Sequence, residues 1–162
     1  MSQANLLIKP IPYPDESAAS LLIRAADANG FPNVYSLCRS QSKSYPKALI
    51  SNVTHQKRFL KLLQLLELSE DHQSLAFQIH GATQASPRQY DEIYISKNLF
   101  RRDALAFCPE CLADSSYWRR HWLLRPYTVC VKHHIQLYDH CPKCRKNLGI
   151  ARNQIHCCNH CG

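Results

Sequence analysis

The sequence contains little glycine, no long apolar run and none of the short motifs of the common hydrolases. Only four glycines occur among its 162 residues, and none forms a loop that could cradle phosphates. It also lacks the His-Glu-x-x-His signature of zinc proteases and the nucleophile elbow of serine hydrolases. We therefore expect a protein without catalytic activity.

Segments that target or cross membranes are also missing. No stretch approaches the roughly 18 apolar residues that a membrane-spanning helix needs. The N-terminus lacks a charged region followed by an apolar stretch and a cleavage site. We expect an intracellular protein with no membrane partner, whose nine cysteines are reduced and mostly spaced for metal binding rather than for disulfides.

The charge of the chain is positive, with 20 lysines and arginines against 12 acidic residues and a formal net charge of +8. Two zinc ions held by seven thiolates would lower this to about +5. The remaining excess favours a polyanionic partner, although a solvated basic surface is common in proteins that bind no nucleic acid.

The N-terminal part has the pattern of an extended arm followed by helices. Prolines 10, 12 and 14 favour an extended arm. Cap residues at 15–17 and apolar positions spaced i, i+3, i+4 and i+7 from Ala18 predict a helix that ends at Asn29–Gly30. Shorter helices are expected over about 33–39 and near 47–51.

Two further helices are expected on either side of a short turn at 65–71. The first begins after Thr54, and the second begins after Ser69 and runs to about Ile79. The spacing fits a helix-turn-helix, but an ordinary helical hairpin is the reading we favour. The second helix has no Lys or Arg, which argues against insertion into a DNA groove.

These patterns define a fold class and three regions. We expect a mainly α protein with small zinc-ribbon or knuckle elements. The regions are an arm and helix-turn-helix-like domain at 1–81, a linker at 82–99 with a short strand near 92–95, and a tandem zinc-finger domain at 100–162.

The strongest chemical signal is a series of paired metal ligands separated by two residues. Such a gap lets one tight turn aim both side chains at one ion, and two turns complete a tetrahedral zinc site. A thioredoxin-type redox pair would not explain four pairs in series. The eight expected ligands of two structural Zn²⁺ ions are Cys108, Cys111, Cys130, His133, Cys141, Cys144, Cys158 and Cys161.

Several alternatives remain open within this ligand scheme. Sequential pairing gives a Cys₃His site and a Cys₄ site, but an interleaved pairing of first with third and second with fourth is also compatible with the spacing. His134 could replace His133, although only His133 keeps the two-residue gap. Cys157 lies beside Cys158 but lacks the correct gap to Cys161, and Cys38 is expected to be a small buried hydrophobe.

Aromatic and basic residues alternate between the first two ligand pairs, over residues 117–125. This composition suits phosphate contact and base stacking, or an arginine-rich protein interface. The alternative is that at least one tryptophan packs against the metal module while the arginines are divided between contact and solvent. We expect Arg119→Ala and Arg120→Ala to leave the fold intact. The candidate nucleic-acid or partner contacts are Arg101, Arg102, Trp118, Arg119, Arg120, Arg125, Lys57, Arg58 and Lys61.

The order of these residues resembles the TniQ/TnsD family. The resemblance rests on Glu16–Ser17, the helix that ends at Asn29–Gly30, Phe107-Cys108-Pro109-x-Cys111, Arg120-x-Trp122 and the ligand pairs that follow. It implies a bacterial, cytoplasmic target-selection protein of transposons, with a helix-turn-helix region and tandem zinc fingers, that performs no chemistry itself.

The implied partners are an AAA+ ATPase regulator of the transposase (TnsC-like) and either target DNA or an RNA-guided CRISPR effector complex. Many members continue into a further helical region, whereas this sequence ends at Gly162, so neither a homodimer nor sequence-specific reading of DNA follows directly. The rival interpretation is a zinc-containing transcription regulator that binds DNA sequence-specifically.

Overall fold

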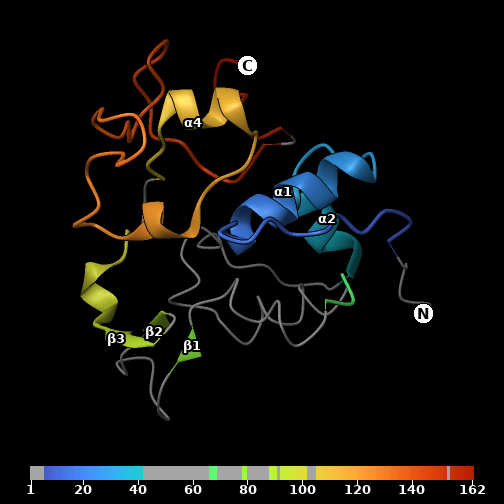
Figure 1. Ribbon diagram of the computed structural model, residues 1–162. Helices are drawn as coiled ribbons and strands as arrows, with labels where there is room; N and C mark the ends of the chain where they lie inside the picture. The colour runs from blue at the N-terminus through green and yellow to red at the C-terminus, as the bar shows by residue number, and fades with distance from the viewer. Residues whose placement is uncertain are drawn as a thin grey trace.

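The computed structural model describes most of the arm, the first two helices and nearly all of the C-terminal third. The described residues are 6–41, 66–68, 78–79, 88–90, 92–101, 105–152 and 154–162. Within them, no helix combines the length and apolar character that crossing a bilayer requires. Two helices, a small sheet and a cysteine-rich region follow one another along the chain (Figure 1).

The elements are short, and much of the C-terminal third consists of turns and isolated bridges. β1, β2 and β3 form an antiparallel sheet in that order, with Gln78 opposite Gln89 and Tyr90 opposite Ile93. The bounds are α1 Ala18–Ala28, α2 Val34–Gln41, β1 Gln78–Ile79, β2 Arg88–Tyr90, β3 Ile93–Ile95, η2 Lys97–Leu99, α4 Pro109–Asp114 and η3 Arg120–Leu123.

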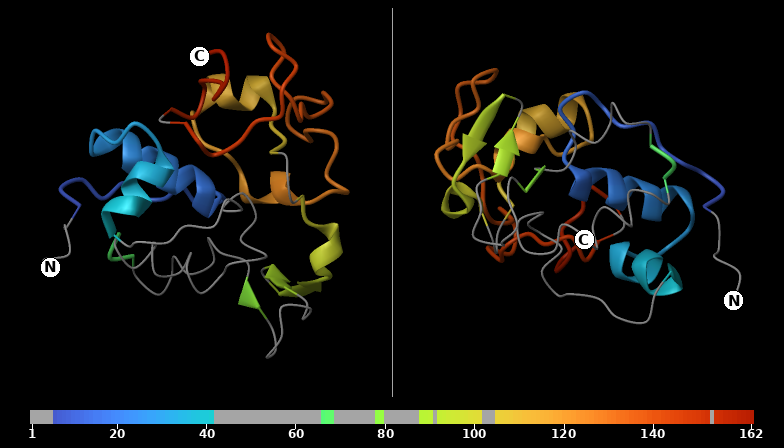
Figure 2. Two further views of the ribbon diagram at one scale, coloured as in Figure 1. Left: turned by 180° about the vertical axis from the view of Figure 1, so that it is seen from behind. Right: turned by 90° about the horizontal axis from the view of Figure 1, so that it is seen from below.

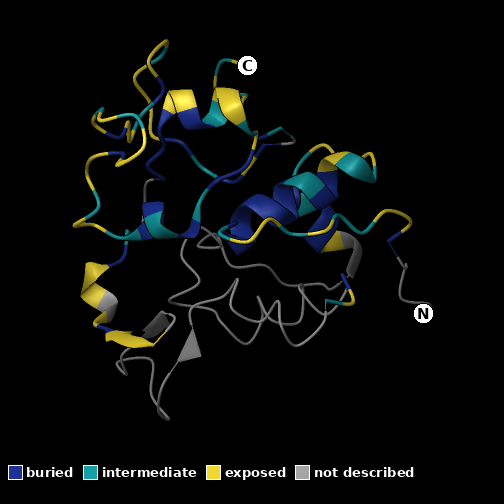
Figure 3. Ribbon diagram, in the orientation of Figure 1, coloured by how far each residue is buried: buried dark blue, intermediate teal, exposed yellow. Residues whose placement is uncertain are grey.

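α1 confirms the helix predicted after Ser17. The Ser17 hydroxyl accepts a hydrogen bond from the Ser20 N–H, and Asn29 closes the other end before Gly30, whose φ of 71° suits glycine. Eight of the eleven residues of this helix are buried, as its mostly dark blue colour in Figure 3 shows. A helix covered on nearly all sides belongs in the centre of a core.

A buried carboxylate anchors the start of α1. The Glu16 side chain is fully buried and accepts hydrogen bonds from the Ser20 hydroxyl at 2.7 Å and from the Arg24 guanidinium at 2.6 Å. Burial raises the pKa of Glu16, while the contacts with Ser20 and Arg24 oppose this effect. A charged group without water needs such partners, so this network fixes how the arm enters the helix.

α2 confirms the short helix expected over 33–39, with its end shifted to Gln41. β3 likewise confirms the strand expected near 92–95. The prediction that a helix runs to about Ile79 is wrong at its end, because Gln78 and Ile79 form β1 and pair with β2. Cross-strand hydrogen bonds decide the conformation there, and a local pattern does not reveal them.

The helix-turn-helix expectation falls mainly on residues for which the structure gives no description. Within the expected turn at 65–71, residues 66–68 do turn, and Glu67 has a φ of 50°. The flanking helices expected over 54–65 and 69–77, and the helix near 47–51, lie outside the described residues. The stretch expected to be a linker, 82–99, contains β2, β3 and η2.

One continuous core joins α1 to the cysteine-rich region. Backbone hydrogen bonds link the Ser17 N–H to the Trp118 carbonyl and the Arg120 N–H to the Asp15 carbonyl, both at 2.7 Å. Glu16 and Arg119 form an antiparallel bridge between them. Because the arm pairs with residues 117–120 in this way, the start of α1 and the segment between two ligand pairs are held as one unit (Figure 2).

Candidate metal centres

The structure brings the four ligand pairs together as two separate clusters. In each cluster the four ligand atoms lie within 4.8 Å of one another, and no sulfur pair is within bonding distance. The grouping is sequential, first pair with second and third with fourth. The two clusters are Cys108, Cys111, Cys130 and His133, and Cys141, Cys144, Cys158 and Cys161.

The spacing inside the clusters fits a tetrahedral ion. The sulfur atoms of Cys111 and Cys130 are 3.6 Å apart, and those of Cys144 and Cys158 are 3.7 Å apart. A tetrahedron with zinc–sulfur bonds of 2.3 Å has edges of about 3.8 Å. Disulfides require about 2.05 Å. Each cluster could therefore bind one metal ion without rearrangement.

The first cluster combines the start of a helix with a hairpin turn. Pro109 begins α4, and the Cys108 sulfur caps it by accepting from the Cys111 N–H at 3.4 Å. The other two positions come from a turn flanked by the bridge between Val129 and Gln136. Proline at the first helical position and a capping sulfur both favour this local geometry, so the sequence itself directs two thiols toward one point.

His133, rather than its neighbour His134, completes the first cluster. The Nδ1 atom of His133 lies 3.3 Å from the sulfurs of both Cys108 and Cys111. Its Nε2 atom lies 3.3 Å from the Asp114 carboxylate at the end of α4. A carboxylate at the far nitrogen orients a metal-binding imidazole and fixes its tautomer. The structure thus supplies the support that such a ligand needs.

The same carboxylate also binds a lysine. The Lys132 ammonium contacts Asp114 and holds the pKa of that carboxyl below its usual range. This arrangement ties the hairpin turn to α4 from outside the cluster. Both partners are exposed, so the pair contributes modest stability, but it fixes the orientation of the carboxylate that faces His133.

The second cluster repeats the hairpin and adds a C-terminal turn. The bridge between His140 and Asn147 flanks the turn that holds Cys141 and Cys144. The remaining two thiols come from residues 158–161, next to Gly162. All four ligands are cysteines, so an occupied site would carry more negative charge than the first.

Backbone N–H groups favour the thiolate form of cysteines in both clusters, at Cys130 in the first and at Cys141 and Cys158 in the second. N–H groups of Cys144 and Lys143 lower the pKa of Cys141 to about 6. Burial raises the pKa of Cys130, but backbone N–H groups of His133 and Lys132, together with the neighbouring cysteines, outweigh it and hold the pKa at about 7. Metals bind thiolates, so the lowered pKa of these cysteines favours metal binding.

Two cysteines lie outside the clusters. Cys157 is half-buried, and its thiol donates to the Gln154 side chain at 3.2 Å. Cys38 is fully buried on α2, as the sequence predicted, and burial raises its pKa to about 12.

The aromatic and basic segment between the first two pairs lies largely in the core. Trp118 is 2% exposed and Trp122 is 1% exposed. Buried indoles do not stack on bases, so the prediction that Trp118 is a contact residue is wrong, while the expectation that at least one tryptophan packs inside is confirmed. Arg120 is also buried, and the Arg119 side chain is 11% exposed.

Arg119 makes several contacts at this junction. Its guanidinium lies over the rings of Tyr117 and Trp122 and 3.8 Å from the Asp15 carboxylate. It also donates to the Cys111 carbonyl at 3.4 Å. These contacts link the arm, the first cluster and the core, so a structural role suits this residue better than a surface contact.

The other expected contact residues lie apart from this junction. Arg125 is exposed, and its Nε donates to the Phe100 carbonyl at 3.0 Å. Arg101 is half-buried and donates to the Tyr127 carbonyl at 3.3 Å. Four others lie outside the described residues: Arg102, Lys57, Arg58 and Lys61.

Sequence reasoning missed a buried arginine beside the second cluster. Arg152 is 5% exposed and donates to the carbonyls of Gly149, Ile155 and Cys157. Its guanidinium stacks over the Trp118 ring at 4.5 Å. Burial lowers its pKa to about 10, against the pull of the nearby thiols. The one sequence signal for this role is that no acidic residue lies near Arg152 in the sequence, which leaves backbone carbonyls and thiolates as its partners.

The fold and the site define a small protein with two cysteine-rich clusters that could each hold a metal ion. The sequence model of the TniQ family matches residues 7–137. The chain therefore belongs to the TniQ family, and this membership implies a role in target selection for transposition. The first cluster lies inside the matched residues, and the second begins beyond them at Cys141. A search of curated proteins finds no match.

Proposed function

We propose that this protein is a non-enzymatic adaptor for DNA transposition. In this proposal it links target DNA, or an RNA-guided effector complex bound to DNA, to an AAA+ ATPase that regulates the transposase. Family membership supports the role in target selection. The adaptor role itself is our inference, because the sequence has no catalytic motif and both clusters have a full set of four protein ligands.

We further propose that the two clusters hold structural zinc. Zinc accepts thiolate and imidazole in tetrahedral sets, and bound zinc would supply crosslinks between turns that have little apolar core of their own. Four protein ligands leave no open position of the kind that catalytic zinc reserves for water. The residues of this chain would then act by shape and charge alone.

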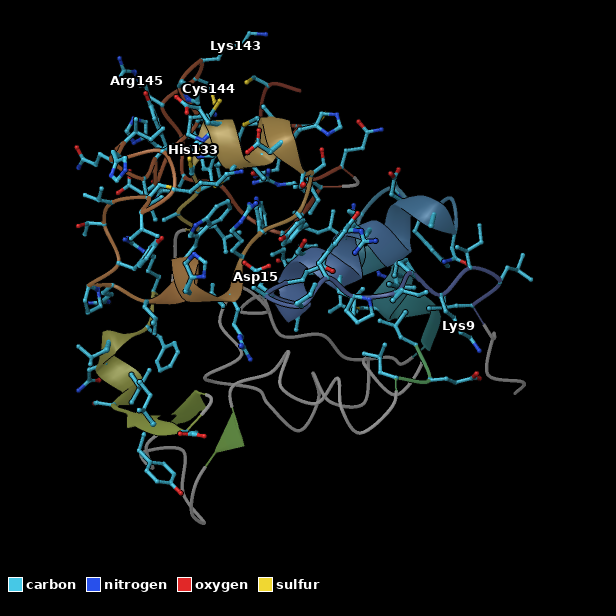
Figure 4. The ribbon with its side chains drawn as sticks, in the orientation of Figure 1. Lys9, Asp15, His133, Lys143, Cys144 and Arg145 are labelled. Carbon is cyan, nitrogen blue, oxygen red and sulfur yellow. The ribbon has the colours of Figure 1, made fainter. Side chains whose placement is uncertain are left out.

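The observation that carries the proposal is the join between the arm and residues 117–120. This segment lies between Cys111 and Cys130 in sequence, so the first cluster closes a loop around the surface on which α1 docks. The Tyr117 hydroxyl donates to Asp15 at 2.7 Å, and the rings of Tyr13 and Tyr117 stack at 4.3 Å. Figure 4 places Asp15 at this junction. A partner bound to either part would meet a rigid body.

The proposal is tested by capture of the ATPase from the same transposon. Immobilised full-length protein, loaded with zinc, is incubated with the ATPase, ATP and duplex DNA, and the bound ATPase is measured. We expect enrichment with the wild-type protein and with Cys157→Ser, which lies outside the clusters. No capture by the wild-type protein would count against the adaptor role, and equal capture by wild type and by Cys158→Ser would show that the second cluster is not needed for it.

A further inference from the structure

Three of the ligand turns end in the same backbone conformation. The residue that follows the last ligand has a positive φ in each: 56° at His134, 62° at Arg145 and 82° at Gly162. Its N–H donates to the carbonyl of the first ligand in every case, at 2.8 Å, 2.8 Å and 3.2 Å. The three turns therefore share one backbone geometry, in which the residue after the last ligand adopts the left-handed conformation.

Glycine is the residue that adopts this conformation without strain. Gly162 meets that requirement, whereas the turn at Cys141 places an arginine there. A long side chain in the left-handed region costs free energy, and such positions cluster where strain serves a function. His134 shares this conformation, so the surroundings of the Arg145 side chain, and not the strain alone, decide its role.

The side chains around Arg145 form a concentrated positive surface. Lys143, Arg145 and Lys146 are all exposed and lie within four residues of one another. Figure 4 shows Lys143 and Arg145 directed away from the body of the protein, beyond Cys144. We call these three residues the hairpin tip.

The cations of the hairpin tip have no carboxylate partners in the described part of the chain. Among the residues that the structure describes, no acidic group lies within ion-pair distance of Lys143, Arg145 or Lys146. By contrast, Lys132 binds Asp114 and Lys9 binds Glu67. The charge of the tip is thus available to an external anion.

The metal site beneath the tip would not cancel this charge. Four thiolates and one divalent ion together carry a charge of −2. Buried Arg152 lies beside them and offsets part of that charge. The three surface cations then exceed the remainder, so the outside of this hairpin stays positive with the ion bound.

The composition of this surface favours nucleic acid over protein. Protein interfaces centre on aromatic or aliphatic anchors. Within the described residues from 141 onward, no large hydrophobic side chain is exposed, whereas the first hairpin exposes Val129 and Val131. Closely spaced Lys and Arg without apolar anchors match the pattern of phosphate contact.

We propose that the hairpin tip binds the phosphodiester backbone of a nucleic acid. The inference rests on the proposed function, because it names the surface through which the adaptor touches the target. The contact fixes position rather than reading sequence, since phosphates carry no base information. The hairpin lies beyond residues 7–137, which the family model matches.

The test is a binding titration over a range of salt concentrations. Full-length zinc-loaded protein is titrated against a labelled duplex DNA and, separately, a single-stranded RNA. We compare wild type with the triple variant K143Q/R145Q/K146Q. Each lost phosphate contact lowers the slope of log K against log salt by about 0.9 on duplex DNA and about 0.7 on single strands. We expect the triple variant to lose about 2.7 of slope on duplex DNA or about 2.1 on RNA.

Single substitutions separate the effect of the hairpin tip from the effect of lowering the net charge of the protein. Arg145→Gly removes both the charge and the strained backbone, so we expect an unchanged or higher melting temperature together with weaker binding. Arg39→Gln, at an exposed position on α2, is the matched control for Arg145→Gln and should retain wild-type affinity. Equal affinities and slopes for wild type, the triple variant and Arg145→Gly would overturn the proposal.

The ATPase capture assay distinguishes this inference from the adaptor role. A triple variant that binds nucleic acid normally but loses the ATPase would show a surface for protein and overturn the proposal. A wild-type protein that captures no ATPase would refute the adaptor role, while the salt titration would still decide what the hairpin tip binds.

Discussion

The guanidinium of Arg152 lies 4.5 Å from the centroid of the Trp118 ring. This contact joins the second cluster to the core, because Trp118 also bonds through its backbone to Ser17 and Ser20 at the start of α1. Arg152, which is 5% exposed, thus stabilises both the second cluster and the core around Trp118.

Replacing Arg152 with Met should therefore destabilise the protein. Three carbonyls would lose their donor and the thiol cluster its nearest buried cation, at a cost of about 2–4 kcal/mol. Thermal unfolding and the rate of zinc release to a chelator measure the effect. Lys143→Met, an exposed change near the same cluster, should behave like wild type in both measurements.

Neighbouring cysteines provide a sharp test of the ligand assignment. Cys158→Ser should reduce the bound zinc from two ions per chain to one, because Cys158 belongs to the second cluster. Cys157→Ser should keep both ions, since Cys157 belongs to neither cluster and a serine hydroxyl can replace its thiol as the donor to Gln154. Elemental analysis of reduced, dialysed protein gives the count. Two ions in both variants would show that the assignment is incorrect.

Substitution of Arg119 tests whether this residue serves the fold. The sequence alone led us to expect that Arg119→Ala leaves the fold intact. The contacts with Asp15 and two aromatic rings indicate a loss of about 1–2 kcal/mol instead. Denaturant unfolding compares this variant with Arg39→Ala, which is exposed on α2. Identical midpoints for the two variants would support the original expectation.

The pH dependence of stability should include a contribution from His121. Burial lowers its pKa below 6.5, helped by Arg119 and Arg120 and opposed by Asp15. As the pH falls below about 6.5, the unfolded chain takes up a proton that the folded protein does not, so stability decreases. His121→Phe retains the ring contact with Tyr127 and should lose less stability between pH 7.5 and 5.5. The two melting-temperature profiles, measured in parallel, would coincide if His121 played no part.

The clusters and the first helix could be predicted from the sequence because their signals are local. A two-residue gap between ligands specifies a turn, and the caps at Ser17 and Asn29 specify a helix. The grouping of turns into clusters involves 18 intervening residues in one case, and the spacing alone fitted two arrangements. The structure adds the sequential grouping.

The parts that could not be predicted depend on contacts between distant segments. The pairing of Gln78 with Gln89 decides that a presumed helix end is a strand. The burial of Trp118 depends on α1, about a hundred residues earlier, and on Arg152. Alternating aromatic and basic residues look the same in sequence whether they face a core or a nucleic acid.

The bond between Asp15 and Tyr117 spans 102 positions of the chain, and this separation has a consequence for biosynthesis. The segment that pairs with the start of α1 is translated seconds after the helix itself, at roughly 5–20 residues per second. Until then, the apolar side chains of the newly made helix lack the core residues and the first cluster against which they pack in the folded protein. With the structural zinc that we propose, metal supply during translation would help to determine how much newly made protein escapes aggregation.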